Sequence, residues 1–187
     1  MDTALVTRAQ QGDQQAFASI ASGIAVRLRK VAYGVLRDMD LAEDAAQQAI
    51  VTIWRDLPRL SDPARFEAWS YRILVRICHA ERRRVHRVTT VSLDSLPTER
   101  HGPDHMGGVV LRDQLERGFA RLSMEHRSVI VLYHQFGMPL AGIAQALDIP
   151  VGTVKSRLHR ATQELRSALE ADLRPTRPVT HPQEVAR

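Results

Sequence analysis

Residues 140–165 read LAGIAQALDIPVGTVKSRLHRATQEL. Apolar residues at helical spacing predict a short helix over 139–147 and a longer helix over 152–169, with a turn at 148–151. A short helix, a tight turn and a longer second helix are the proportions of a helix-turn-helix unit. Units of this kind place the second helix in the major groove of DNA.

The longer helix carries two different faces. At about 100° per residue, Val154, Leu158, Ala161 and Leu165 fall within one narrow arc, which we expect to face the domain core. The opposite face combines long cationic side chains with shorter polar ones: Lys155, Ser156, His159, Arg160, Gln163 and Arg166. Such groups suit phosphates and base edges. A solvated basic face is the alternative interpretation, and the preceding short helix and turn favour DNA reading.

Helical periodicity continues through most of the remaining chain. Residues 1–85 predict one helix after another, and Pro58 ends a helix whose apolar stripe is Ala45, Ala46, Ala49, Ile50, Ile53 and Trp54. Turn-forming residues replace the apolar stripe between 88 and 108. The sequence therefore predicts an all-α chain of two small helical domains, 1–87 and 109–171, joined by a flexible linker at 88–108 and followed by a disordered tail at 172–187.

The composition excludes several classes of protein. The chain has 187 residues, of which 44% are hydrophobic and 25% charged, as in ordinary globular proteins. No apolar run approaches the roughly 20 residues of a membrane span, and no secretory signal begins the chain, so we expect a cytoplasmic protein without membrane insertion. A single cysteine, Cys78, excludes a disulfide framework and a cysteine-based zinc site. The net charge of +5 indicates a polyanionic partner, with nucleic acid as the first candidate.

Residues 152–161, GTVKSRLHRA, resemble the GTVKSRLxRA signature of bacterial sigma-70 family sigma factors, specifically the extracytoplasmic-function (ECF) group. Apolar residues upstream, among them Leu122, Val129 and Leu132, match region 4 of that family. The resemblance implies that this helix reads the −35 promoter element through Thr153, Lys155, Ser156, Arg157, His159 and Arg160. Gly142 departs from the family pattern, which usually has an acidic residue at that position.

Residues 42–54, AEDAAQQAIVTIW, are similar to region 2.2 of the same family, commonly written AEDLVQEVFLRVW. The resemblance implies docking on the clamp coiled coil of the RNA polymerase β′ subunit through a polar, partly acidic helix face: Asp40, Glu43, Asp44, Gln47 and Gln48. A polar outer face on a helix with an apolar inner face suits a non-obligate interface. The alternatives are a solvated acidic face or a metal site, and no histidine lies near these carboxylates at ligand spacing.

Residues 66–73, FEAWSYRI, resemble the family's FxxWLYRI, which together with the preceding loop handles the −10 element. Holding an open strand needs aromatic platforms, a polar pocket and cations. The implied −10 and duplex-phosphate set is Arg59, Arg65, Phe66, Trp69, Arg72, Arg76, Arg82, Arg83 and Arg84. Phe66 and Trp69 also share a core stripe with Ile73. Arg76 stands where the family commonly has asparagine, so we expect an altered −10 base preference.

The two resemblances, in this order along the chain, imply an ECF-type sigma factor: an initiation factor without catalytic residues, metal or cofactor of its own. The implied partners are core RNA polymerase, through its β′ clamp and β flap, promoter DNA, and an anti-sigma factor as a family expectation. Three alternatives remain, and one of them is a helical anti-partner protein that merely resembles a sigma factor. A stand-alone helix-turn-helix regulator would bind a palindromic duplex as a homodimer. A metal-dependent DNA-processing enzyme would use Asp40, Glu43 and Asp44, around which no nucleophile or base is arranged.

Overall fold

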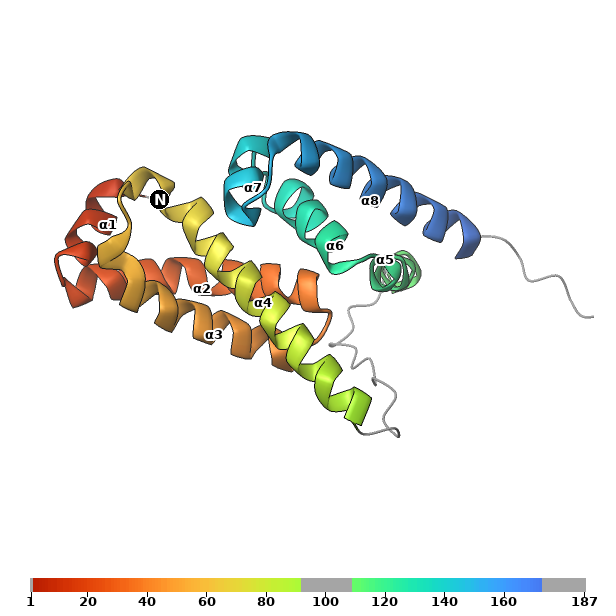
Figure 1. The fold of residues 1–187 in the computed structure, drawn as a ribbon, viewed down its shortest axis with the longest axis horizontal. Helices are drawn as coiled ribbons and strands as arrows, with labels where there is room; N and C mark the ends of the chain where they lie inside the picture. The colour runs from red at the N-terminus through yellow and green to blue at the C-terminus, as the bar shows by residue number, and fades with distance from the viewer. Residues whose placement is uncertain (1, 92–108, 173–187) are drawn as a thin grey trace, which may run out of the picture.

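The computed structural model describes residues 2–91 and 109–172, which form two helical bundles without any strand in those ranges (Figure 1). The first bundle contains α1 (Thr3–Gln10), α2 (Gln14–Leu36), α3 (Met39–Asp56), the short turns η1 (Leu57–Arg59) and η2 (Pro63–Arg65), and α4 (Phe66–Val91). The second contains α5 (Val109–Arg121), α6 (Met124–Ile130), the π-helical segment η3 (Val131–Gln135), α7 (Leu140–Leu147) and α8 (Val151–Asp172).

These elements confirm the prediction of an all-α fold with two helical domains. Helix α4 continues to Val91, three residues beyond the predicted start of the linker at 88. The rest of the predicted linker, from residue 92, and the predicted tail from residue 173 lie outside the described residues. Helix α1 is a separate element, and the sequence did not predict where it ends.

Aspartate side chains fix where the helical segments of the first bundle begin. Asp13, Asp38 and Asp62 each accept a hydrogen bond at 2.9 Å from a backbone N–H two or three residues further on. A helix start has unpaired N–H groups, and a capping carboxylate satisfies one of them. Pro63 follows Asp62 directly and needs no N–H partner, so this pair sets the direction in which the chain enters α4.

The core of the first bundle is built on α2 and α3. Helix α2 buries apolar residues at helical spacing: Ile20, Ile24, Leu28, Val31 and Val35. Helix α3 packs on it through small alanines, Ala42, Ala45, Ala46 and Ala49, which are buried and let the two helices approach closely. Trp54, which the pattern placed in the same stripe, is 38% exposed instead, and its ring packs against the ring of Phe17 in a tilted arrangement with the ring centres 4.5 Å apart. The apolar side of α3 is therefore narrower than predicted.

The two bundles pack side by side. Helix α7 lies against α4, while α6 and η3 lie against α2 (Figure 1). Gly34 permits this approach, because a Cβ at that position would lie 2.6 Å from the nearest methyl carbon of Val131. The rings of Tyr71 and Phe136 meet at 6.0 Å across the same boundary. The described residues therefore share one continuous hydrophobic core.

Replacing Leu28 with alanine should lower the free energy of unfolding by roughly 2 to 5 kcal/mol, because the side chain is 1% exposed and its loss leaves a cavity. Val51→Ala on α3 is the matched control, since Val51 is 65% exposed and its truncation should change stability by less than about 0.5 kcal/mol. Urea unfolding followed by circular dichroism measures both. Equal destabilisation by the two variants would contradict the assignment of the core.

Candidate nucleic-acid and protein interfaces

Helix α8 presents the basic face that its sequence predicts. Val154 and Ala161 are fully buried, so the helix is anchored by its apolar arc. All six side chains of the opposite face are exposed: Lys155, Ser156, His159, Arg160, Gln163 and Arg166. This face can present cationic and hydroxyl donors to phosphates and base edges without any rearrangement of the second bundle.

The turn before α8 has a fixed geometry. Asp148 ends α7 with a left-handed backbone, at φ +58°, and the next N–H, of Ile149, donates to the carbonyl of Ala144 at 3.1 Å. The carbonyl of Pro150 then accepts from the N–H groups of Thr153 and Val154, at 2.9 and 3.1 Å, which starts α8. The Ala144 carbonyl in the last turn of α7 is thus satisfied within the motif.

Two members of the predicted −35 set are less accessible than the others. Thr153 and Arg157 are half-buried. Arg157 lies near His79 on α4 and Glu125 on α6, where its charge lowers the pKa of both groups. The larger cause at His79 is burial, which lowers its pKa, and at Glu125 it is a hydrogen bond from its own backbone N–H. In this arrangement Arg157 faces the neighbouring helices as well as solvent.

The outer face of α3 is polar, as predicted. Asp40, Asp44, Gln47 and Gln48 are exposed, and Glu43 is half-buried beside Arg29, with its Oε2 atom 3.3 Å from an Arg29 nitrogen. No cluster of three or more histidine, cysteine or acidic residues that could hold a metal occurs in residues 2–91 and 109–172.

Sequence reasoning missed the apolar extension of this surface. Val51 and Trp54 continue the exposed side of α3 beyond Gln47 and Gln48, at the three- and four-residue steps of a helix. The helical spacing of Val51 and Trp54 from Asp44 could have predicted that they share its exposed face. Valine and tryptophan are usually buried, however, so the sequence favoured a place in the core. An exposed aromatic beside a polar face is typical of protein interfaces.

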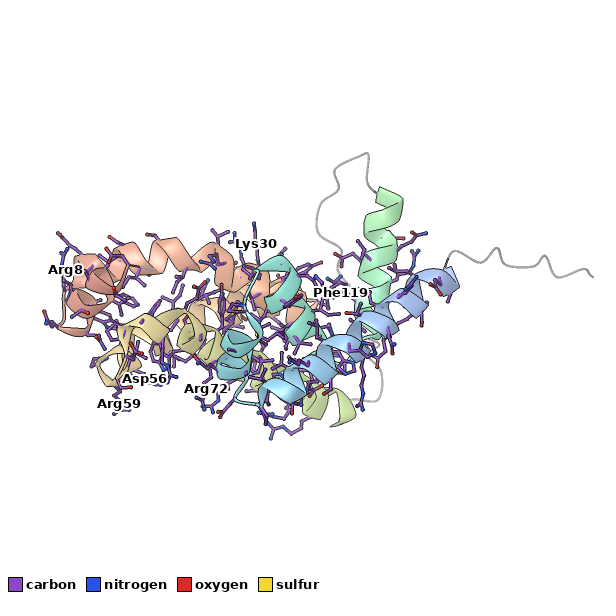
Figure 2. All side chains as sticks on the ribbon, turned by 90° about the horizontal axis from the view of Figure 1, so that it is seen from above. Arg8, Lys30, Asp56, Arg59, Arg72 and Phe119 are labelled. Carbon is purple, nitrogen blue, oxygen red and sulfur yellow. The ribbon has the colours of Figure 1, made fainter. Side chains whose placement is uncertain are left out.

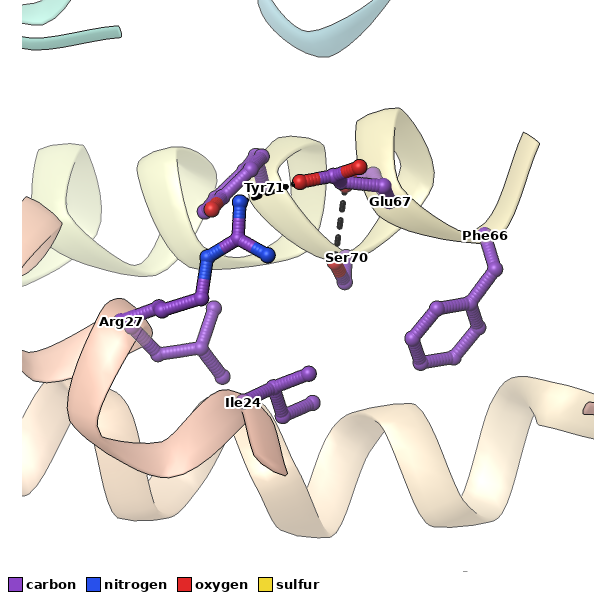
Figure 3. Close-up of a pocket in the computed structure, with 7 residues that line it drawn as sticks. Ile24, Arg27, Phe66, Glu67, Ser70 and Tyr71 are labelled. Atoms are coloured by element: carbon purple, nitrogen blue, oxygen red, sulfur yellow. Dashed lines mark hydrogen bonds and ion pairs between the residues drawn. The ribbon is translucent and has the colours of Figure 1, made fainter. Parts of the chain in front are cut away.

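The first residues of α4 are held in place by contacts with the core and with α2. Phe66 is 1% exposed and packs into the core near Ile24. Arg27 on α2 reaches the Glu67 carboxylate at 2.5 Å, and the hydroxyl of Ser70 donates to the Glu67 carbonyl at 2.8 Å (Figure 3). These contacts hold the first turns of α4 in one orientation. Phe66 is a core residue in this structure, as its shared stripe with Trp69 and Ile73 predicts, and its role at the −10 element stays a prediction.

The other predicted −10 residues lie on the outer side of the loop and of α4. Arg65, Trp69 and Arg72 line a cavity of about 310 Å³ together with Leu60, Ser61 and Ala68. Arg59 projects from the end of the bundle, and Arg72 lies where the two bundles meet (Figure 2). Further along α4, Arg82, Arg83 and Arg84 are exposed, as is Arg87. The loop and α4 thus form a cationic surface with one aromatic side chain.

The second bundle covers part of this surface. The same cavity is closed on its other side by Gln145 and Asp148 of the helix-turn-helix motif. The Asp148 carboxylate accepts hydrogen bonds from both Arg72 and Arg76, the latter at 3.2 Å. No local pattern predicts these contacts, because the partners are more than 70 residues apart in the chain.

The side chain of Cys78 on α4 is buried, and this burial raises the pKa of its thiol to about 12. A thiol reacts as the thiolate, so we expect maleimide to modify native Cys78 at pH 7.5 at least about 100-fold more slowly than the protein unfolded in guanidinium. Mass spectrometry of timed reactions measures both rates. Rapid labelling of the native protein would contradict the buried position.

None of the described helices is long and apolar enough to cross a membrane. The chain matches two family models, Sigma-70 region 2 over residues 24–88 and Sigma-70, region 4 over residues 112–165. It is 35% identical over 136 residues to the ECF RNA polymerase sigma factor SigL of Mycobacterium tuberculosis, covering 71% of this chain and 77% of SigL.

Two solved structures share the fold. One is the sigma factor RpoE of Bartonella quintana in complex with the anti-sigma factor NepR, with a TM-score of 0.72 and 25% identity over 83% of this chain and 98% of RpoE. The other is CnrH in complex with the cytosolic domain of CnrY, with a TM-score of 0.66 and 26% identity over 91% of this chain and 98% of CnrH. Both family models fall on the bundles that carry the surfaces described above, in the same order. The chain belongs to the ECF sigma factors of the sigma-70 family.

Proposed function

We propose that this protein binds core RNA polymerase and directs promoter-specific transcription initiation by reading a −35 and a −10 element. The observation that carries the proposal is the presence, in one chain, of a solvent-facing basic helix in a helix-turn-helix motif and of a separate cationic and aromatic surface on α4. One chain that carries two separate DNA-binding surfaces can contact two promoter elements that lie apart on the DNA. A cytoplasmic location follows from this role.

The −35 element is read by α8. Lys155 and Arg160 supply the long cationic groups that reach guanine edges and phosphates, and Ser156 and His159 supply shorter polar groups. Arg166 lies on the same face nearer the end of the helix, where it forms an ion pair with Glu170 at 3.1 Å. The first three helical turns of α8 therefore carry the base contacts.

The −10 element is held by the loop before α4 and by the start of α4. Trp69 provides an aromatic surface, and Arg65 and Arg72 provide charge beside the cavity. The arginines from 82 to 84 add duplex-phosphate contacts without sequence information. Strand opening needs no chemistry from this chain, because preferential binding of the open strand shifts the equilibrium by the difference in affinity.

Docking on the polymerase uses the outer face of α3 on the β′ clamp and the second bundle on the β flap. The exposed Val51 and Trp54 extend the polar face of Asp40, Asp44, Gln47 and Gln48 with apolar area. Nucleotide chemistry and its metal ions belong to the polymerase, so this chain acts as a non-catalytic factor. An anti-sigma factor is a further partner, since RpoE was solved in complex with the anti-sigma factor NepR and CnrH in complex with the cytosolic domain of CnrY.

The test is transcription in vitro from a randomised promoter library with purified protein and core polymerase. We expect transcripts that depend on the protein and share two upstream elements. No protein-dependent initiation with an active core would overturn the proposal. Tight binding of a palindromic duplex by a homodimer would instead favour a stand-alone regulator, and Mg²⁺-dependent cleavage by the protein alone would favour a nuclease.

A further inference from the structure

A cavity of about 490 Å³ lies between the end of α2 and the helix α5 of the second bundle. One wall runs from the last turns of α2 to the first residue of α3, and α5 with η3 forms the other wall. Lys30 of the first bundle and Phe119 of the second, both labelled in Figure 2, belong to these two walls. Cavities of this size at the meeting of two domains are typical of small-molecule sites. Among the described residues that line it, none belongs to the sets assigned above to promoter DNA or to the β′ clamp.

The lining of this cavity carries an excess of positive charge. Its described residues include three cations, Arg29, Lys30 and Arg37, and one carboxylate, Glu116. Glu116 pairs with Arg37, and Arg29 pairs with Glu43 at 3.3 Å in a contact that is nearly half exposed. Lys30 is exposed and forms no ion pair with any residue in 2–91 or 109–172. The cavity therefore attracts an anion, and Lys30 is available to neutralise it.

Planar groups lie beside these charges. The guanidinium of Arg37 lies over the ring of Tyr33, at 5.0 Å from its centre, and over the ring of Phe119, at 5.8 Å. Arg37 holds a left-handed backbone at the end of α2, with φ +63°, and the hydroxyl of Tyr33 donates to the Glu116 carboxylate at 3.4 Å. These contacts hold the planar groups in place before any ligand binds, which lowers the entropy cost of binding.

The cavity also offers apolar surface that opens to solvent. Met39 is 44% exposed and Leu115 is 37% exposed, and they line the cavity from opposite bundles. Together with the ring of Phe119 they provide a surface on which an aromatic ring would lose contact with water. Apolar and aromatic area beside a few charged groups suits a ligand with a flat apolar ring and an anionic group.

We propose that this cavity binds a small aromatic anion of the nucleoside monophosphate class. Arg29 and Lys30 bind the phosphate, and the base packs on Phe119 beside the Arg37 guanidinium. The Glu116 carboxylate accepts hydrogen bonds from N–H groups on the edge of the base. The inference goes beyond the proposed function and does not depend on it, because it uses other residues and another ligand.

The first arm of the test titrates the full chain with guanosine 5′-monophosphate by isothermal calorimetry, since guanine carries two adjacent N–H donors. We expect one molecule bound per chain with a dissociation constant below about 1 mM. Inorganic phosphate, which lacks the ring, and guanosine, which lacks the charge, should each bind at least about tenfold more weakly. No binding at 10 mM nucleotide would overturn the inference, and so would equal binding of inorganic phosphate.

Two cavity variants test the cations. Arg29→Gln combined with Lys30→Gln should weaken nucleotide binding at least about tenfold, because it removes both proposed phosphate contacts. The matched control is Arg8→Gln combined with Arg55→Gln, which also removes two exposed cations of the first bundle. Each of these is paired with an aspartate and lies outside the cavity. An equal loss in the control would show attraction to net charge alone and overturn the inference.

A third cavity variant tests the aromatic wall. Phe119→Leu keeps an apolar side chain but removes the ring, and it should weaken nucleotide binding at least about fivefold. Phe17→Leu is its matched control, because Phe17 is another half-buried aromatic and packs on Trp54 outside the cavity. Circular dichroism confirms that each variant is folded. Unchanged affinity in both the cation and the aromatic variants would overturn the inference.

The last arm locates the nucleotide in the unaltered protein, so it does not depend on how any variant folds. The chain is irradiated with 8-azidoguanosine monophosphate, and mass spectrometry of its peptides identifies the labelled residues. We expect labels within 29–39 or 115–119, which excess guanosine 5′-monophosphate suppresses. Labels confined to the basic face of α8 would place the nucleotide on the DNA-reading surface and contradict the assignment of this cavity.

Discussion

The double variant Lys155→Ala and Arg160→Ala should lower −35-dependent transcription by about 30-fold or more, while its affinity for core polymerase stays within about twofold of the parent. Each cationic contact to a base edge or phosphate contributes roughly 1 to 3 kcal/mol, and both side chains are exposed on the reading face of α8. The polar face of α3 belongs to the other bundle and is unchanged. Multiple-round transcription and a fluorescence titration of labelled protein with core polymerase measure the two effects.

Arg166→Ala is the control for this variant, because it removes a cation from the same face two helical turns further along α8. Its effect on −35-dependent transcription should be less than about threefold, since exposed ion pairs such as Arg166–Glu170 contribute little. An equal loss of core affinity in the double variant would show that the reading face of α8 also docks on the polymerase. The separation of DNA reading on that face from docking on α3 and on the rest of the second bundle would then be wrong.

Asp44→Arg should have the converse effect and weaken binding to core polymerase by roughly 10- to 100-fold. Asp44 is exposed at the centre of the polar face of α3, so its reversal puts an unmatched cation into the proposed interface. Mismatched charges at an interface cost several kcal/mol in unfavourable cases. Binding of the isolated protein to a −35 duplex should stay unchanged. The fluorescence titration with core polymerase measures the first effect, and anisotropy with a duplex measures the second.

Glu170→Arg is the matched control, because it makes the same reversal of charge on an exposed position of the second bundle. Its core affinity should remain within about twofold of the parent. If Asp44→Arg bound core polymerase as tightly as the parent, the outer face of α3 would be a solvated surface and the docking site would have to lie elsewhere.

Periodicity was sufficient to predict the two faces of α8. Val154 and Ala161 are buried and the six polar positions opposite them are exposed, because a helix with one apolar arc has only one way to face a core. The same reasoning wrongly predicted a core position for Trp54, which packs against Phe17 but is 38% exposed. Spacing alone does not distinguish a core aromatic from one at the margin of the core.

The packing of the two bundles could not be predicted from the sequence. It depends on the missing side chain at Gly34, on the left-handed backbone at Asp148 and on ion pairs between residues more than 70 positions apart. None of these has a local pattern, and the resemblance to the family extends to the surfaces of each bundle but not to their contact. The same contact explains why Arg72 and Arg76, predicted to meet DNA, meet a carboxylate here.

In the proposed function, this one chain both docks on core polymerase and holds the promoter strand that opens at the −10 element. The most direct measurement places 2-aminopurine in the −10 element of a promoter recovered from the library and follows its fluorescence as the base leaves the stack. We predict a rise only when core polymerase and this protein are both present, and a loss of that rise with Lys155→Ala and Arg160→Ala. No rise with a verified complex of the two, or an equal rise with core polymerase alone, would contradict the account.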